Sequence, residues 1–269
     1  MASLAQTERL AALRATIADI ERRPVLAETI PAPHGGTDGF LAPAPGLVQE
    51  IFTDERRHAG ATLGFALAQA RGLLTVERPA VVYLQLQAEA QEMGLPYGPG
   101  LVNMGFDPTA LVLIRPANIV EFLWAAEEAI ACRAVAAVVA DVAGQPKALN
   151  FTASRRLSLR AASSGASAFF LRYGAWREAS AAQLRWHIAP ALSGPLPFDA
   201  RAPGETRWQA KLEKGAITDM QNQEWLLEWT ENGFEIIDTG SASPVQPVAR
   251  PALSRPVPAD LADRHPQTA

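Results

Sequence analysis

The chain has 269 residues and a mass of 28.8 kDa, enough for one large domain or two small ones. Apolar residues make up 48% and charged residues 19% of the sequence, so a sizeable core is expected and wholesale disorder is excluded. The net charge of −4 excludes a uniformly basic nucleic-acid coat, although a local basic patch is still allowed.

The single cysteine, Cys132, excludes a disulfide framework and a cysteine-rich zinc site, and the four histidines lack ligand spacing, so no metal site is expected. No stretch of about 18 apolar residues lacks charges. Glu8 and Arg9 also interrupt the N-terminal apolar run, which argues against a secretory signal. We therefore expect no membrane span and a cytoplasmic location.

The first predicted element is an amphipathic helix within residues 1–30. Over residues 4–23, four apolar side chains recur at three- and four-residue spacing: Leu10, Leu13, Ile17 and Ile20. Pro24 ends this helix, and residues 31–45 form a Pro- and Gly-rich linker. The helix either folds back on its own domain or binds a partner or a second copy of the chain, and the four apolar residues are its candidate contacts.

Residues 46–239 alternate β-type runs with helical runs, which predicts an α/β core. Several of the β-type runs carry no charge, and strands of that kind are covered on both faces of a mostly parallel sheet. We expect strands at 47–52, 80–86, 111–115, 135–140 and 166–171, and helices at 62–72, 118–133 and 152–163. Three shorter runs are expected to add antiparallel strands at one sheet edge: 184–189, 206–213 and 225–229.

The last segment, residues 240–269, contains six prolines and little bulky apolar content. This composition predicts a disordered C-terminal tail.

Three stretches of the core resemble the ImuA family: Tyr97–Leu101 (YGPGL), Leu123–Ala129 (LWAAEEA) and Phe151–Leu157 (FTASRRL). In addition, the order of the strands and helices resembles the ATPase core of RecA recombinases, with Asp141 closing one strand and Gly204–Arg207 opening another. The resemblance implies a RecA-like, P-loop-type three-layer fold with a mostly parallel sheet and antiparallel edge strands.

The ImuA family belongs to bacterial damage-inducible mutagenesis operons. The resemblance therefore implies a role in translesion synthesis during the SOS response. It also implies the partners: ImuB, an error-prone C-family DNA polymerase, and RecA.

The loop from Thr53 to Thr62 stands where RecA relatives carry a phosphate-binding P-loop. Such a loop needs glycines, a lysine that neutralises phosphate charge, and a Ser or Thr that holds magnesium. Here Gly60 is the single glycine of the loop, and the first 146 residues contain no lysine. The degenerate nucleotide site retains only Gly60, Thr62 and Asp141, the last at the position of the magnesium-shell carboxylate.

A hydrolytic relative also has a glutamate beyond the second strand, where it orients the attacking water. The resemblance puts Gln87 at that position, and a neutral amide is a poor general base. We therefore expect no cofactor, no catalytic residues and no ATPase activity, and a scaffold role instead. Two alternatives stay open: a divergent ATPase acting on DNA, in which Arg56 or Arg57 replaces the lysine, and a cell-division inhibitor of the SOS response.

Residues 150–210 carry a net charge of +5, which is compatible with an anionic partner. Six arginines are the candidate DNA contacts: Arg155, Arg156, Arg160, Arg172, Arg177 and Arg185. Trp176 and Trp186 are candidates for stacking on bases. The alternative is that the arginines lie over apolar surface and the tryptophans pack inward.

Overall fold

The computed structural model describes residues 40, 43–196, 198–199, 202–215, 223–230 and 232–237. The predicted N-terminal helix with Leu10, Leu13, Ile17 and Ile20, most of the linker, and the predicted tail lie outside the described residues. No helix within the described ranges combines the length and apolarity that crossing a membrane requires.

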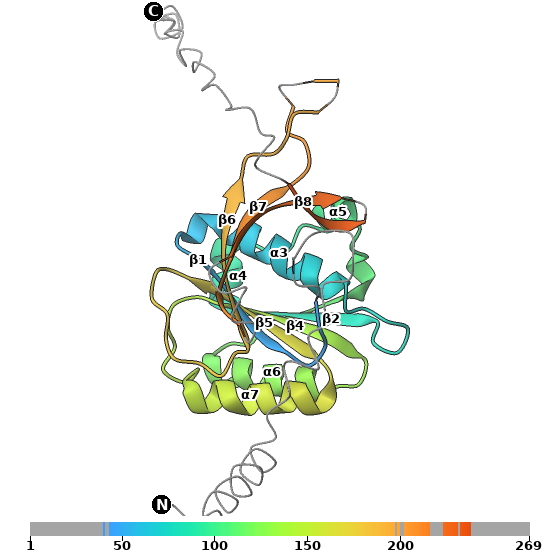
Figure 1. Cartoon of the computed structure of the whole chain (residues 1–269). Helices are drawn as coiled ribbons and strands as arrows, with labels where there is room; N and C mark the ends of the chain where they lie inside the picture. Colours follow the sequence, from blue (N-terminus) through green and yellow to red (C-terminus); the bar gives the residue numbers. More distant parts are fainter. Residues whose placement is uncertain are drawn as a thin grey trace, which may run out of the picture. The chain divides into compact units, whose positions relative to one another are not determined.

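The described residues build one nine-stranded sheet with the order β3-β2-β4-β5-β1-β6-β7-β8-β9 (Figure 1). The strands are β1 (Val48–Thr53), β2 (Ala80–Gln85), β3 (Leu111–Ile114), β4 (Val135–Val142), β5 (Ser167–Tyr173), β6 (Leu184–Ala191), β7 (Arg207–Lys214), β8 (Glu224–Thr230) and β9 (Gly233–Ile236). The pairs from β3 to β6 are parallel, and the pairs from β6 to β9 are antiparallel.

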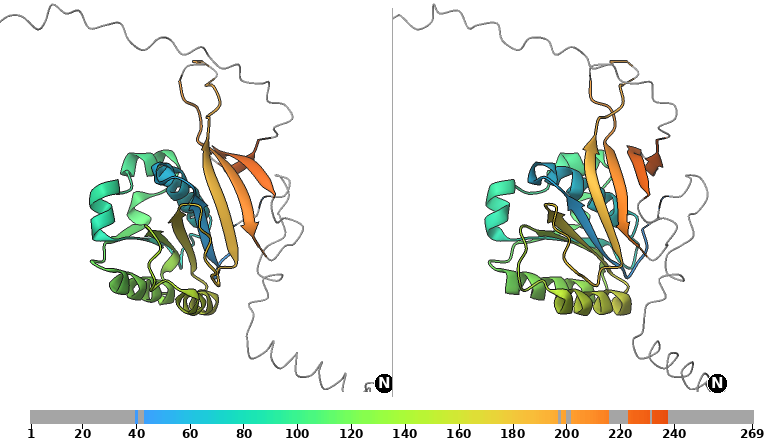
Figure 2. Two further views of the ribbon diagram at one scale, coloured as in Figure 1. Left: turned by 90° about the vertical axis from the view of Figure 1, so that its left-hand side faces the viewer. Right: turned by 60° about the vertical axis from the view of Figure 1, so that its left-hand side comes forward.

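Helices cover both faces of the parallel strands, so the core has three layers (Figures 1 and 2). One face packs against α6 (Ile119–Ala131) and α7 (Phe151–Ser164), and the other against α3 (Ala59–Arg71). Two shorter helices, α4 (Gln87–Met93) and α5 (Gly98–Asn103), follow β2, and the 3-10 turns are η1 (Arg56–His58) and η2 (Pro108–Ala110). This confirms the predicted three-layer α/β fold with a mostly parallel sheet.

Side-chain caps set the starts of the two long helices on the α6–α7 face. The side chain of Asn118 accepts hydrogen bonds from the backbone amides of Val120 and Glu121, and that of Asn150 accepts one from Ala153. Asparagine is among the preferred N-cap residues because its oxygen satisfies amides that have no partner within the helix. Gly165 ends α7 in the left-handed conformation. The predicted bounds of these helices are therefore close to the observed ones.

The direction of one strand differs from the prediction. β6 was expected to be antiparallel, but it pairs parallel with β1 and antiparallel only with β7. The reason lies in residues 174–183, which return beside α7: the amide of Ala181 donates to Ser154 Oγ, and Gln183 Nε2 donates to Ser158 Oγ. Gln183 also accepts from the amide of Val48, so β6 begins beside the start of β1.

An aromatic cluster joins the antiparallel strands to α3. Its rings lie 5.1–6.4 Å from their neighbours, and its members are Phe40, Phe65, Trp186, Trp208, Trp225, Trp229 and Phe234. Aromatic pairs of this kind contribute about 0.5–1.5 kcal/mol each beyond the burial of their area. Trp186 is fully buried in this cluster, so it does not stack on a bound base.

Candidate functional site

The loop between β1 and α3 has no free cation to offer a phosphate. Arg56 forms ion pairs with Glu89 and Glu92 of α4, and Arg57 pairs with Glu55 of the loop itself. These are the two arginines that a divergent ATPase would use in place of lysine. Both are already neutralised by carboxylates.

Asp141, at the end of β4, is the centre of a buried polar network. Its carboxylate accepts hydrogen bonds from the Tyr83 and Tyr173 hydroxyls, at 2.8 Å each, and from Gln85 Nε2 at 3.2 Å. Burial raises the pKa of Asp141, while the three hydrogen bonds oppose that rise. Burial and the nearby carboxylate raise the pKa of both tyrosines, so their hydroxyls stay protonated and remain donors.

The network extends to the first turns of α3 through Thr62. Thr62 is fully buried, its hydroxyl donates to the carbonyl of Ala59 at 2.9 Å, and it also interacts with the Tyr173 hydroxyl. The structure therefore brings Thr62 and Asp141 together, with Tyr173 between them. Thr53 Oγ1 and Gln85 Oε1 are buried without a hydrogen-bond partner in the described structure.

Gly60, the third residue of the predicted nucleotide site, lies elsewhere. Two residues apart on a helix correspond to a rotation of about 200°, so Gly60 and Thr62 face opposite sides of α3. Gly60 is exposed, and a Cβ atom built on it meets nothing within 4 Å. It lines a groove on the outer side of α3 and takes no part in the Asp141 network.

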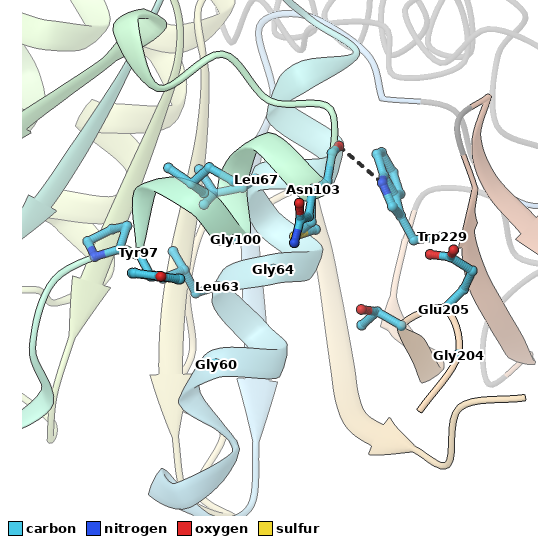
Figure 3. A pocket seen from close by; sticks show the side chains of 14 residues that line it. Gly60, Leu63, Gly64, Leu67, Tyr97, Gly100, Asn103, Gly204, Glu205 and Trp229 are labelled. Atoms are coloured by element: carbon cyan, nitrogen blue, oxygen red, sulfur yellow. Dashed lines mark hydrogen bonds between the residues drawn. The ribbon is translucent and has the colours of Figure 1, made fainter. Parts of the chain in front are cut away.

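This groove has a volume of about 450 Å³ and is lined by α3, α5, residues 204–206 before β7, and Trp229 of β8 (Figure 3). Gly60, Leu63, Gly64 and Leu67 form one stripe of α3 along it. Across from that stripe, Trp229 Nε1 donates to the carbonyl of Met104 at 3.1 Å, which ties β8 to the end of α5. The lining combines apolar side chains, among them Leu63, Leu67 and Trp229, with the polar side chains of Asn103, Glu205 and Thr206. The carboxylate of Glu205 disfavours a phosphate in this groove.

Three of the predicted DNA contacts are paired with carboxylates: Arg172 near the end of β5, Arg177 in the segment after it, and Arg185 near the start of β6. Arg185 pairs with Glu50 at 2.7 Å, Arg177 pairs with Glu213 at 2.7 Å, and Arg172 lies 3.5 Å from Glu178. Arg172 is only 5% exposed, and burial lowers its pKa. Its side chain is therefore not at the surface where a phosphate contact would need it.

The other three predicted contacts lie on α7. Arg156 pairs with Glu127 of α6, and Arg160 lies 3.8 Å from Glu128. Arg155 is exposed and has no ion pair within the described residues. Of the six arginines, Arg155 is thus the one whose charge no described carboxylate offsets.

Sequence reasoning missed Tyr83, Tyr173 and Gln85 as parts of the network, and α5 as a wall of the groove. Cys132 is exposed and directly follows the last residue of α6. Among the described residues, no cluster of His, Cys, Asp and Glu side chains could hold a metal ion.

No family model matches the sequence. Protein ImuA from two strains of Caulobacter vibrioides is 32% identical over 189 residues, which cover 66% of this chain and 72% of that protein. The chain belongs to the ImuA family. Among solved structures, the RadB recombinase aligns with a TM-score of 0.47 and 16% identity over 72% of this chain and 92% of that one.

The three stretches that carried the resemblance to the ImuA family lie in different parts of the core. Tyr97–Leu101 starts α5 and lines the groove, Leu123–Ala129 forms the middle of α6, and Phe151–Leu157 begins α7. The first stretch therefore belongs to the groove, and the other two to the opposite face of the sheet.

Proposed function

We propose that this ImuA-family protein is a non-catalytic accessory factor of damage-inducible mutagenesis that serves as a scaffold for ImuB. The observation that carries the proposal is the network of Tyr83, Tyr173 and Asp141. It joins Asp141, which the resemblance to RecA relatives puts at the position of the magnesium-shell carboxylate, to two tyrosine hydroxyls of neighbouring strands. If the fold is kept without a phosphate site, the role that remains for it is to bind other proteins through its surface.

Electrostatics supports the loss of nucleotide binding. Without a magnesium ion between them, the buried carboxylate of Asp141 and a phosphate about 4 Å away would repel by roughly 4 kcal/mol at an effective dielectric of 20. Arg56 and Arg57 would have to exchange Glu89, Glu92 and Glu55 for the phosphates to offset this repulsion. Among the described loop residues, no unpaired arginine or lysine is therefore available to bind phosphate in a divergent ATPase.

The test is calorimetric titration of the full chain with ATP, with and without Mg²⁺. We expect no saturable heat, and no hydrolysis by the same preparation. Asp141→Asn is the informative variant, because it removes the repelling charge and keeps the side-chain shape. Saturable binding that depends on Mg²⁺ and disappears in Asp141→Asn would overturn the proposal and establish an ATP site.

The scaffold role has a candidate surface on α6. Trp124 is 67% exposed and Val120 is 70% exposed, and they lie four residues apart on one face of the helix. An exposed tryptophan beside a second apolar side chain is typical of a protein-binding hot spot. We propose this face for ImuB, with the error-prone polymerase, RecA or a second copy of the chain as further candidates for the same test.

DNA contact stays a secondary proposal, supported by the free charge of Arg155. A single exposed arginine predicts weak binding with a shallow dependence on salt. Arg155→Ala should remove that binding, while Arg177→Ala, whose charge already pairs with Glu213, should leave it unchanged. Single-stranded DNA titrated at two salt concentrations measures the difference.

A further inference from the structure

The groove between α3 and α5 has the form of a helix-binding site. On α3, Gly60 and Gly64 lie one turn apart and alternate with Leu63 and Leu67 along one stripe (Figure 3). Gly60 has open space beside it, whereas Gly64 lies against the side chains of Trp208 and Met104. Gly100 presents another position without a side chain from α5. Glycines let a second helix approach closely, and the leucines give its apolar side chains something to contact.

The described chain begins next to this groove. The Phe40 ring packs 5.4 Å from Phe234, and Phe234 packs 5.1 Å from Trp229, which lines the groove. Pro43 lies against the end of α3, at Gly72. Phe40, the first described residue, therefore lies one aromatic ring away from the groove wall.

We propose that residues 4–23 bind in this groove of the same chain as an amphipathic helix. Residues 24–39 connect the two, and a flexible linker of that length has a root-mean-square span of roughly 20–24 Å. Such a linker holds the helix at an effective concentration in the millimolar range, so a weak contact suffices for occupancy. A helix of 20 residues is about 30 Å long, so it contacts the groove with part of its length.

The sequence of the segment fits the groove. Leu10, Leu13 and Ile17 form its apolar stripe. The charged side chain that lines the groove is Glu205. The segment carries a net positive charge, opposite in sign to Glu205. It contains four arginines and three acidic residues: Arg9, Arg14, Arg22 and Arg23, and Glu8, Asp19 and Glu21.

Occupancy has a functional consequence. A partner helix that uses the groove must first displace residues 4–23, so the segment competes for the site. This consequence concerns the groove and does not depend on whether ImuB binds α6.

Hydrogen–deuterium exchange of the full chain tests the proposal with two variants and a matched control for each. Leu13→Glu places a charge in the apolar stripe, and Ala15→Glu places the same charge on the opposite side of the predicted helix. Gly60→Leu fills the groove at a position where a Cβ has open space. Ala162→Leu adds the same side chain at an exposed position of α7. All four variants keep the described core contacts.

We expect amides in residues 4–23 to exchange at least about tenfold more slowly in the unmodified chain, Ala15→Glu and Ala162→Leu than in Leu13→Glu and Gly60→Leu. The protection should be unchanged over a roughly 100-fold dilution, because the contact lies within one chain. Equal, unprotected exchange in every variant overturns the proposal. Protection that survives Gly60→Leu overturns the groove as the site, and protection that is lost on dilution shows a second copy as the occupant.

Discussion

The two sides of α3 differ in how their side chains use the space beside the helix. On the inner side, Thr62 interacts with the Tyr173 hydroxyl, which donates to the buried carboxylate of Asp141. On the outer side, Gly60 and Gly64 border a groove whose lining combines leucines with polar side chains. One helix thus has a closed polar network on its inner side and an open groove on its outer side. The same helix in the same fold therefore has two different surroundings, and the side chains on each side determine which kind of ligand fits there.

The largest expected effect concerns the anchor that keeps α3 in place. Trp208 of β7 is fully buried and its Nε1 donates to the carbonyl of Ala61 on α3 at 2.9 Å. Trp208→Ala should lower the free energy of unfolding by about 3–5 kcal/mol, since it leaves a cavity and an unpaired carbonyl. Urea denaturation measures the change.

The matched control for Trp208→Ala is Trp176→Ala. Trp176 is 79% exposed, so its removal should change the free energy of unfolding by less than about 0.5 kcal/mol. Equal losses in the two variants would show that β7 does not hold α3, and the difference between the two sides of the helix would lose its structural basis.

The next effect concerns the Asp141 network on the inner side of α3. Asp141→Ala leaves the Tyr83 and Tyr173 hydroxyls and the Gln85 amide without their acceptor, so unfolding should become easier by about 2–4 kcal/mol. Asp141→Asn keeps one acceptor oxygen and should lose about half as much. Denaturant midpoints of both variants give the comparison.

Glu128→Ala serves as the control for Asp141→Ala, because Glu128 is an exposed carboxylate 3.8 Å from Arg160. Exposed pairs contribute about 0–1 kcal/mol. If Asp141→Ala were no more harmful than Glu128→Ala, the network would not be what fills the inner side of α3.

The sequence predicted the fold better than it predicted these two sides. The strand at 80–86 and the helix at 152–163 are observed at Ala80–Gln85 and Phe151–Ser164, because buried strands and amphipathic helices leave local periodicities. Helix α5 was missed because two glycines and a proline in Tyr97–Leu101 resemble a turn. The parallel pairing of β6 was missed because strand direction depends on the path of residues 174–183, which has no local signature.

The candidate site was harder to predict for a geometric reason. Tyr83 stands opposite Val139 in the sheet, yet its hydroxyl reaches Asp141, two residues further along the same face of β4. Long side chains cross register positions in this way, and sequence spacing does not reveal it. Gly60 and Thr62 were grouped because they are adjacent in the loop motif, although helical rotation separates them.

A smaller effect is expected at the exposed face of α6, which lies on the other side of the sheet from α3. Trp124→Ala should weaken binding to ImuB about tenfold, because truncating an exposed aromatic anchor removes about 1–2 kcal/mol of binding free energy. The free energy of unfolding should change by less than about 0.5 kcal/mol, since Trp124 is 67% exposed. Calorimetric titration with purified ImuB measures the affinity.

Gly60→Leu sharpens the result for Trp124→Ala, because it changes the groove and leaves α6 intact. ImuB binding weakened by Gly60→Leu and unaffected by Trp124→Ala would move the proposed partner surface from α6 to the groove.

The smallest expected effect is a pH dependence of stability that comes from the closed side. Burial raises the pKa of Asp141 above the ordinary value of 3.8, and the hydrogen bonds from Tyr83, Tyr173 and Gln85 limit the rise. Between the ordinary and the raised pKa, the folded state binds more protons than the unfolded state, so the free energy of unfolding falls as pH increases through this window. The contribution is fully present below the ordinary pKa and is lost above the raised one.

Asp141→Asn has no proton to bind, so its denaturant midpoint should lack this part of the slope while the rest of the pH profile stays the same. Identical profiles for the two proteins would mean that Asp141 has the same pKa in the folded and unfolded states, so that the effect of burial would not exceed that of the three hydrogen bonds.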